Sequence, residues 1–218
     1  MRSAHGHPFR SRPAGPSRSG FPGLIAAAVI GLAPPVHADP GAACVITQVA
    51  GTAEVSARNT GEHPAEPGLR IGHNATLRTG EGARVTLTCP DGLEVVVGPQ
   101  SEITVSGLLE GPTRPFGLRL MDGIAGFLFD RHAGDGIQVR TPPAVAAVRS
   151  TEWAMQVQDR ASAVFARDGT VFVVAGGGTV RLGAGDGVDV TGAGSVGPVV
   201  RWGAARIDLF ADLLGPGW

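Results

Sequence analysis

The sequence predicts an all-β domain, a compact sandwich or roll of many short strands with Asp-Gly hairpins, plus one amphipathic helix at the C-terminus. Glycine and proline supply 34 and 17 of the 218 residues, a proportion that disfavours a helical bundle and favours strands joined by tight turns. Apolar residues alternate over short runs such as residues 85–87 and 153–157, and a period of two is typical of half-buried strands. Asp-Gly occurs five times, and this dipeptide supplies the positive φ that a tight hairpin needs.

Residues 1–38 have the features of a secretory signal peptide. The first 20 residues contain four arginines and no acidic residue, and an apolar stretch follows at residues 21–33. Ala38 then supplies a small residue before Asp39, as a cleavage site requires. The apolar stretch is shorter than the roughly 20 residues that span a bilayer, which disfavours an uncleaved membrane anchor. We therefore expect cleavage after Ala38, export to the periplasm, and no membrane insertion of the mature chain.

The composition narrows the classes of function. All 18 basic residues are arginine, and the absence of lysine excludes Schiff-base chemistry and the P-loop lysine. Without residues 1–38 the chain keeps 14 arginines and all 19 acidic residues, which gives a net charge near −5. That charge suits an exported acidic domain, and it argues against a nucleic-acid partner or binding to an anionic membrane.

The two cysteines, Cys44 and Cys89, are a candidate disulfide because an oxidising compartment permits their pairing. Strand alternation places Cys89 on the core-facing side of its strand. In the first strand, Val45 and Val49 share one face and Cys44 lies on the other, so pairing requires a bulge or a strand end. Two unpaired thiols are the alternative. A lipoprotein anchored through Cys44 is disfavoured because residues 41–43 lack the large aliphatic residue expected three places before such a cysteine.

The chain divides into three parts. Residues 39–190 form the expected all-β domain, with a hinge near residues 107–115 if it divides into two lobes. Residues 191–218 form a glycine-rich connector and the C-terminal helix, which we expect within residues 199–214. The residues of this helix at helical spacing are Trp202, Ala205, Arg206, Leu209, Phe210 and Leu213. Such a stripe covers the core of its own domain or is offered to a partner protein.

Sequence motifs for catalysis, cofactors and metals are weak or missing. Residues 192–197 match the dinucleotide-binding glycine pattern, but no second strand follows, so we interpret them as a flexible linker. His63, His73 and His132 are not spaced as metal ligands, and no serine occupies a Gly-x-Ser-x-Gly elbow. We therefore predict no catalytic, cofactor-binding or metal-binding residues, no cofactor, and no enzymatic activity. An envelope hydrolase whose acid pair is not recognisable from spacing is an alternative.

Two stretches of the chain carry an ordered set of motifs. Residues 69–103 contain Thr79-Gly80, Asp91-Gly92 and a closing Pro99-x-Ser101-x-Ile103, and residues 118–185 contain Thr141-Pro142, Arg149-Ser-Thr-Glu-Trp153 and Gly169-x-Val171. In this order the motifs resemble those of the FecR domain of bacterial envelope proteins. Ser150 and Trp153 depart from the family's usual Gly and Phe, although Trp153 keeps the aromatic role.

The resemblance implies a bacterial periplasmic FecR-like protein, in an exported form without the cytoplasmic anti-sigma segment of the family's signalling members. It further implies non-catalytic binding of another, unidentified envelope protein in signalling or envelope regulation. A sensor for a small ligand, for example a ferric chelate, is the alternative that the family name suggests.

Within residues 149–153, Arg149 and Glu152 are the candidate contacts to a partner or ligand. Strand alternation turns Thr151 and Trp153 inward, and we expect Trp153 to fill the core. Glu152 then faces outward, within reach of Arg149.

Overall fold

The computed structural model of the chain describes residues 42–218, apart from residues 58–60, 107–115, 130–135, 149–150 and 217. Within these residues the chain forms seventeen strands, one 3-10 turn and one α-helix, so the predicted fold class, all-β with a single C-terminal helix, is confirmed. That helix, with 11 residues, is too short to cross a membrane, and the described residues contain no longer one. The expected signal peptide at residues 1–38 and the expected hinge at 107–115 lie outside the described residues.

In chain order the strands are β1 (Ala42–Ala50), β2 (Ala53–Ala57), β3 (Gly61–Pro64), β4 (Arg70–Gly72), β5 (Thr76–Thr79), β6 (Arg84–Thr88), β7 (Leu93–Val97), β8 (Glu102–Ser106), β9 (Phe116–Phe129), β10 (Ile137–Arg140), β11 (Val145–Val148), β12 (Glu152–Gln158), β13 (Ala161–Asp168), β14 (Val171–Ala175), β15 (Gly178–Leu182), β16 (Asp186–Val190) and β17 (Val200–Arg201). The 3-10 turn is Pro90–Gly92, and helix α1 is Ala204–Leu214.

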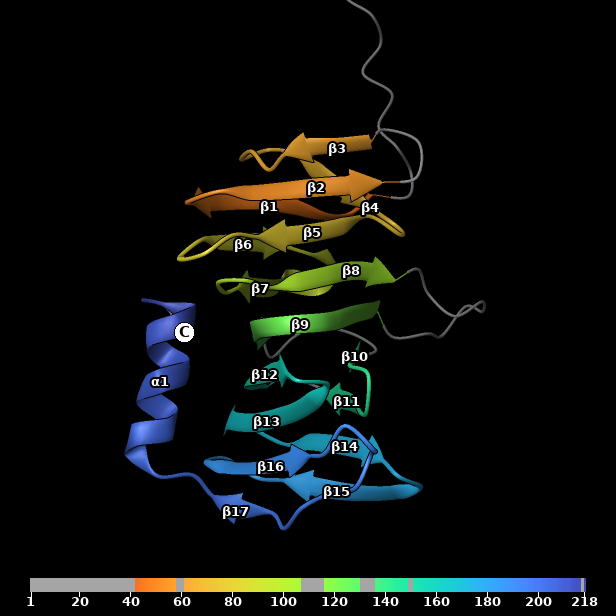
Figure 1. The fold of residues 1–218 in the computed structure, drawn as a ribbon, viewed down its shortest axis with the longest axis vertical. Helices are drawn as coiled ribbons and strands as arrows, with labels where there is room; N and C mark the ends of the chain where they lie inside the picture. The colour runs from red at the N-terminus through yellow and green to blue at the C-terminus, as the bar shows by residue number, and fades with distance from the viewer. Residues whose placement is uncertain (1–41, 58–60, 107–115, 130–135, 149–150, 217) are drawn as a thin grey trace, which may run out of the picture. The chain divides into compact units, whose positions relative to one another are not determined.

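The strands from β1 to β17 form two sheets that enclose a common core (Figure 1). Sheet A has the order β4-β1-β6-β7-β9-β12-β13-β16-β17. Sheet B has the order β3-β2-β5-β8-β9-β10-β11-β14-β15. Neighbouring strands are antiparallel except β9 and β10, which run parallel. The chain passes back and forth between the two sheets. In both sheets, therefore, the strands before β9 lie on one side of it and the strands after β9 lie on the other.

Strand β9 belongs to both sheets because it bends near its middle. Its first half, up to Asp122, pairs with β8 of sheet B, and its second half, from Ala125, pairs with β7 of sheet A. Gly123 lies between the halves with a φ of 82°, a conformation that residues with a Cβ avoid. The sequence predicts a hairpin at Asp122-Gly123, and this expectation is wrong. A positive φ at Asp-Gly usually closes a hairpin. In β9 the positive φ of Gly123 instead bends a single strand, which leaves sheet B and enters sheet A.

The principal core lies between the two sheets. Trp153 of β12 is fully buried there, and its ring stacks on Phe127 of β9 with centroids 4.3 Å apart. Met155 and Val157 follow Trp153 on the same inward face of β12 and are also buried. The alternation of apolar residues in this strand therefore corresponds to one face that packs against sheet B.

A second apolar cluster lies on the outer face of sheet A, beneath helix α1. It joins Phe165 of β13 to Trp202, Phe210 and Trp218 through stacked or edge-on ring contacts. Two of these rings pack directly against glycines of sheet A, where a Cβ would occupy the same space as the ring. A Cβ on Gly187 would lie 2.7 Å from Cδ1 of Trp202, and a Cβ on Gly126 would lie 2.5 Å from Nε1 of Trp218. The helix thus covers its own domain.

The residues that α1 buries differ from the expected stripe. Phe210 and Leu214 are buried and Ile207 and Leu213 are partly buried, whereas Leu209 is 52% exposed. Ala205 is exposed as well. The helix begins only at Ala204, after the Trp202 ring has docked on the sheet. The rotation of α1 about its own axis is therefore set by the packing of Trp202 and Trp218 on the sheet, and not by the local spacing of apolar residues.

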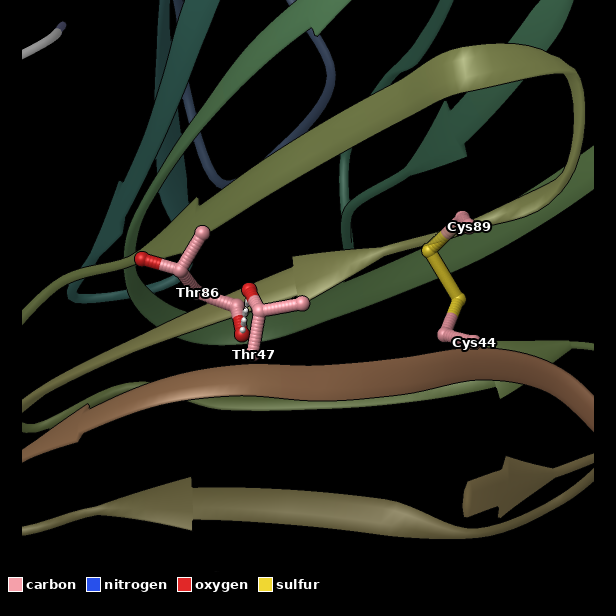
Figure 2. The surroundings of a disulfide bond; sticks show 4 residues. All are labelled: Cys44, Thr47, Thr86 and Cys89. Atoms are coloured by element: carbon pink, nitrogen blue, oxygen red, sulfur yellow. Dashed lines mark hydrogen bonds between the residues drawn. A yellow bond between two sulfur atoms is a disulfide. The ribbon is translucent and has the colours of Figure 1, made fainter. Parts of the chain in front are cut away.

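The predicted disulfide between Cys44 and Cys89 is present (Figure 2). It joins β1 to the residue that follows β6, and both cysteines are buried in the principal core. The expectation that Cys44 lies on the outer face of β1 is wrong, because Cys44 and Ile46 both face inward.

A β-bulge in β1 explains this error. Ile46 lies opposite Leu87 while Gln48 lies opposite Thr86, so Thr47 is an extra residue between them. The Thr47 hydroxyl donates a hydrogen bond to the Thr86 carbonyl oxygen at 3.2 Å (Figure 2). A bulge shifts the alternation of a strand by one residue. Before the bulge the even-numbered residues Cys44 and Ile46 face the core, and after it the odd-numbered residue Val49 packs against the same core. Strict alternation along β1 does not predict this change.

Candidate functional site

The predicted contact residue Glu152 begins strand β12 and forms an ion pair with a neighbouring strand. Its Oε2 lies 3.6 Å from Nε of Arg167 on β13, and both side chains are a little under half exposed. Arg149, the other predicted contact, lies outside the described residues. An exposed pair of this kind stabilises a fold by about 0–1 kcal/mol, and the role of Glu152 as a contact to a partner or ligand stays a prediction.

Thr151 and Trp153 occupy the structural positions at the start of β12. The Thr151 side chain is 2% exposed, and its hydroxyl donates to the Thr170 carbonyl oxygen at 3.3 Å. Trp153 fills the core against Phe127. These two residues attach the beginning of β12 to the core of the domain.

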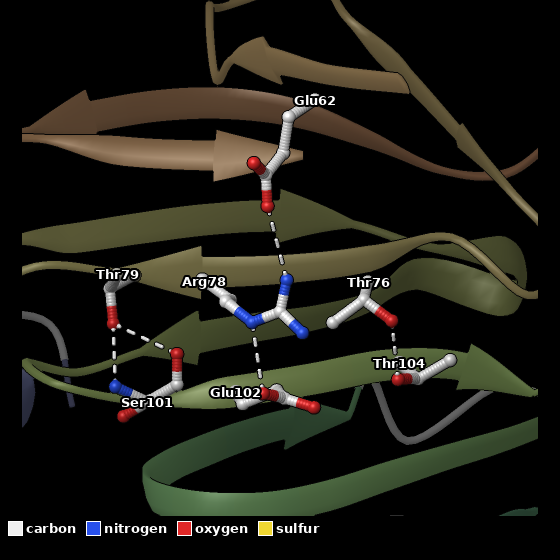
Figure 3. A network of polar contacts seen from close by, with 7 residues as sticks. All are labelled: Glu62, Thr76, Arg78, Thr79, Ser101, Glu102 and Thr104. Atoms are coloured by element: carbon white, nitrogen blue, oxygen red, sulfur yellow. Dashed lines mark hydrogen bonds and ion pairs between the residues drawn. The ribbon is translucent and has the colours of Figure 1, made fainter. Parts of the chain in front are cut away.

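The motif residues that led to the family resemblance share a property that sequence reasoning missed: several are buried hydroxyls that bind backbone groups. Ser101 is 3% exposed, and its Oγ accepts a hydrogen bond from the Ile124 N–H at 2.9 Å. Its hydroxyl can donate to the Pro99 carbonyl oxygen at 2.9 Å. Thr79 Oγ1 accepts from the Ser101 N–H at 2.9 Å (Figure 3), and it donates to the Gly98 carbonyl oxygen at 2.6 Å.

These bonds hold the bend of β9 against the chain before β8, because Ile124 directly follows Gly123. Thr141 plays a similar part between β10 and β11. Its Oγ1 accepts from the Ala144 N–H at 3.2 Å and from the Ser162 hydroxyl at 2.8 Å. The hydroxyls of Thr79, Ser101 and Thr141 thus form internal hydrogen bonds that stabilise the scaffold of the domain.

We predict that Ser101→Ala lowers the free energy of unfolding by about 1–3 kcal/mol, because it leaves the buried Ile124 N–H without its acceptor. The measurement is urea denaturation followed by tryptophan fluorescence. Ser195→Ala is the matched control, since Ser195 is exposed and a surface change of this kind stays within about 0.5 kcal/mol. Equal effects of the two changes would show that Ile124 finds another partner.

An open groove of about 450 Å³ lies where β12, β13 and β16 meet α1. Its charged lining residues are Asp159, Asp189 and Arg206. Arg206 is bound by Asp189, with Nη1 2.9 Å from Oδ2, and its guanidinium carbon lies 3.7 Å from the centre of the Trp202 ring. Among the described residues that line the groove, Arg206 is the one cation, and its charge is neutralised by Asp189. The groove itself is therefore poorly suited to an anionic ligand.

The described residues contain no group of three or more His, Cys, Asp and Glu side chains that could hold a metal ion. His63 and His73 belong to the described part of the chain, and His132 lies outside it.

The outer face of sheet B has a polar half formed by β2, β3, β5 and β8. Arg78 of β5 lies between two carboxylates, with Nε 2.9 Å from Glu102 and Nη1 3.4 Å from Glu62 (Figure 3). The hydroxyls of Thr76 and Thr104 are hydrogen-bonded to each other at 2.8 Å. These charges and hydroxyls are thus partnered across neighbouring strands.

The other half of the same face, formed by β9, β10, β11, β14 and β15, is apolar at its centre. Phe172 and Val174 of β14 are 45% and 42% exposed. They lie directly opposite Ala147 and Val145 of β11 in the strand register. We call this half of the sheet the Phe172 face, and it is the part of sheet B where large apolar side chains point to solvent.

The fold and these contacts define a two-sheet all-β domain in which buried hydroxyls connect neighbouring segments of the scaffold. Residues 75–172 match the model of the FecR protein family. The resemblance drawn from the sequence is therefore confirmed, and this segment of the chain is a FecR domain. The match supports a signalling or regulatory role.

Two crystal structures of a candidate anti-sigma factor from Parabacteroides distasonis share the fold. Their sequences are 20% and 21% identical to this chain, and each superposes with a TM-score of 0.52. The match covers 61% of this chain and 62% of those chains, so the similarity extends over less than two thirds of their length. No curated protein matches the sequence.

Proposed function

We propose that this protein is a non-catalytic FecR-domain protein of the periplasm that binds another envelope protein and thereby takes part in signalling or envelope regulation. The observation that carries the proposal is the FecR match over residues 75–172. The fold is shared with a protein described as a candidate anti-sigma factor, a description that implies action by binding another protein. We extend this mode of action, without its particular partner, to the present chain.

Two features support export. The basic and apolar segments of residues 1–38 have the order of a secretory signal peptide. The Cys44–Cys89 bond lies in the core of the domain, and structural disulfides persist in oxidising compartments such as the periplasm. A chain that relies on this bond is best suited to fold after export.

The hydrogen bonds that the buried hydroxyls of Thr79 and Ser101 form with the backbone support a non-catalytic role. A serine or threonine nucleophile needs a base nearby and access to substrate. Ser101 and Thr79 instead are buried and bind backbone groups on both sides.

The test uses the full chain, carrying a C-terminal tag and expressed at its natural level in its own cells. We expect the periplasmic fraction to contain a chain that begins at Asp39, by intact mass, and mild crosslinking to join it to a second protein. A chain without residues 1–38 is the control, and it should stay in the cytoplasm without that adduct. Retention of residues 1–38 in a membrane fraction would overturn cleavage, and a full-length chain found in the cytoplasm would overturn export. An exported chain that gives no adduct above background would overturn partner binding.

A further inference from the structure

The apolar centre of the Phe172 face is continuous across two strands. Ala147 lies opposite Phe172, and Val145 lies opposite Val174, so four apolar side chains occupy neighbouring positions. Val145 and Ala147 are partly exposed, like their partners on β14. A cluster of exposed apolar side chains on a sheet marks a surface that contacts another molecule more often than an isolated one does.

Arginines border this centre on both sides. Arg140 of β10 lies opposite Val145, and Arg119 of β9 lies opposite Arg140. On the other side, Arg181 of β15 lies opposite Phe172. Strands β10, β11, β14 and β15 contain no aspartate or glutamate.

The arginines of this border have fewer carboxylate partners than Arg78 in the polar half of the sheet. In the part of the chain that the structure describes, neither Arg119 nor Arg140 has a carboxylate partner, whereas Arg78 has two. Arg181 donates a hydrogen bond to the Thr170 hydroxyl at 3.1 Å. Two like charges on directly opposed positions of adjacent strands repel each other. An acidic group bound between them would remove that repulsion.

The spacing of the arginines limits what can satisfy them together. Arg140 and Arg181 are separated by three strand intervals, which is roughly 14 Å. A single phosphate cannot reach both sides of the apolar centre, whereas a protein surface with several carboxylates can. Interfaces between proteins combine an apolar centre with a charged rim and are enriched in arginine.

We propose that the Phe172 face docks a surface of the partner envelope protein that carries carboxylates on both sides of an apolar centre. This inference rests on the proposed function, because it assigns a surface and a partner chemistry to the binding proposed there. It places the contact on sheet B, away from the α1-covered face of sheet A and from Glu152.

The test replaces Phe172 with the photo-crosslinking amino acid p-benzoylphenylalanine in the full, exported chain in its own cells. The same replacement of Glu54, an exposed residue on β2 in the polar half of sheet B, is the control. We expect a crosslinked protein from position 172 and about tenfold less from position 54. Mass spectrometry should place the adduct on a partner peptide in which aspartates or glutamates flank apolar residues.

Charge reversal provides the second arm. R119E/R140E, in the chain that crosslinks through position 172, should reduce the adduct about tenfold, as loss of close interfacial charge pairs does. R70E/R160E is the matched control, because it alters the net charge equally at exposed positions away from this face, and its adduct should persist. If R119E/R140E fails to fold by circular dichroism, R119Q/R140Q removes the same charges and keeps the side-chain length.

The outcomes separate this inference from the proposed function. Adducts from position 54 but not 172 would overturn the docking face and leave partner binding in place. An adduct at position 172 with a lipid, with a second copy of this chain or with a basic peptide would overturn the acidic partner. Absence of adducts from both positions, together with absence of any chemically crosslinked partner, would overturn both proposals.

Discussion

Gly123→Ala is expected to lower the free energy of unfolding by about 2–5 kcal/mol, because two costs coincide at the bend of β9. The φ of 82° is unfavourable for any residue with a Cβ. In addition, that Cβ would lie 2.5 Å from the Cα of Ser101, which is backbone and cannot move independently. Ser101 in turn binds the amide of Ile124. The substitution therefore opposes both the conformation of the bend and the contact that holds it.

Gly82→Ala separates these two costs. Gly82 also has a positive φ, 64°, but a Cβ there would meet nothing within 4 Å. We expect a loss of about 1–2 kcal/mol for this control, from the backbone conformation alone. Both variants are measured by urea denaturation with tryptophan fluorescence. Equal losses would contradict the close approach of Gly123 and Ser101 as a source of the effect.

Removal of the disulfide is the second large effect. The double variant Cys44→Ala/Cys89→Ala should unfold with a free energy about 4 kcal/mol lower than that of the original chain. The loop-entropy relation gives this magnitude for the sequence separation of 45 residues. The bond ties β1 to the end of β6, and it limits the unfolded chain over that whole loop.

A thiol reductant provides the control for this prediction. Dithiothreitol should destabilise the original chain by a similar amount, and it should leave the double variant unchanged. Denaturation curves with and without reductant, with intact mass to verify reduction, measure both effects. An original chain that is fully reduced yet equally stable would contradict a stabilising role for the bond.

Local chemistry in the sequence is enough to predict the class of fold. Alternating apolar residues in segments such as 153–157 require one face of a strand to be buried, whatever that face packs against. The helical spacing of residues 199–214 likewise predicts a C-terminal helix, and the observed helix lies within that range. Cys44 and Cys89, the only cysteines in the chain, leave one intramolecular pairing. These features depend on neighbours in the sequence or on simple chemistry, and the structure agrees with each.

The sequence also identifies the FecR domain from an ordered set of motifs, although it does not reveal what the motif residues do. Ser101 and Thr79 bind backbone groups on segments distant in the sequence. Spacing within a motif contains no information about those partners. The proposed contact Glu152 similarly has Arg167 as its neighbour because β12 and β13 pair in one particular register.

Only the tertiary structure decides the remaining features, because each depends on which strands become neighbours. The bulge at Thr47 turns Cys44 inward, and the bend at Gly123 moves β9 from sheet B to sheet A. The packing of Trp202 and Trp218 against glycines of sheet A determines which side of α1 is buried. The Phe172 face likewise unites residues from β9, β10, β11, β14 and β15, which no local pattern groups together. The sequence by itself determined the kind of domain through short-range preferences, and it offered Cys44 and Cys89 as one candidate pair. The surface that we propose for docking follows from long-range strand order, since strand pairing alone brings its arginines and apolar side chains together.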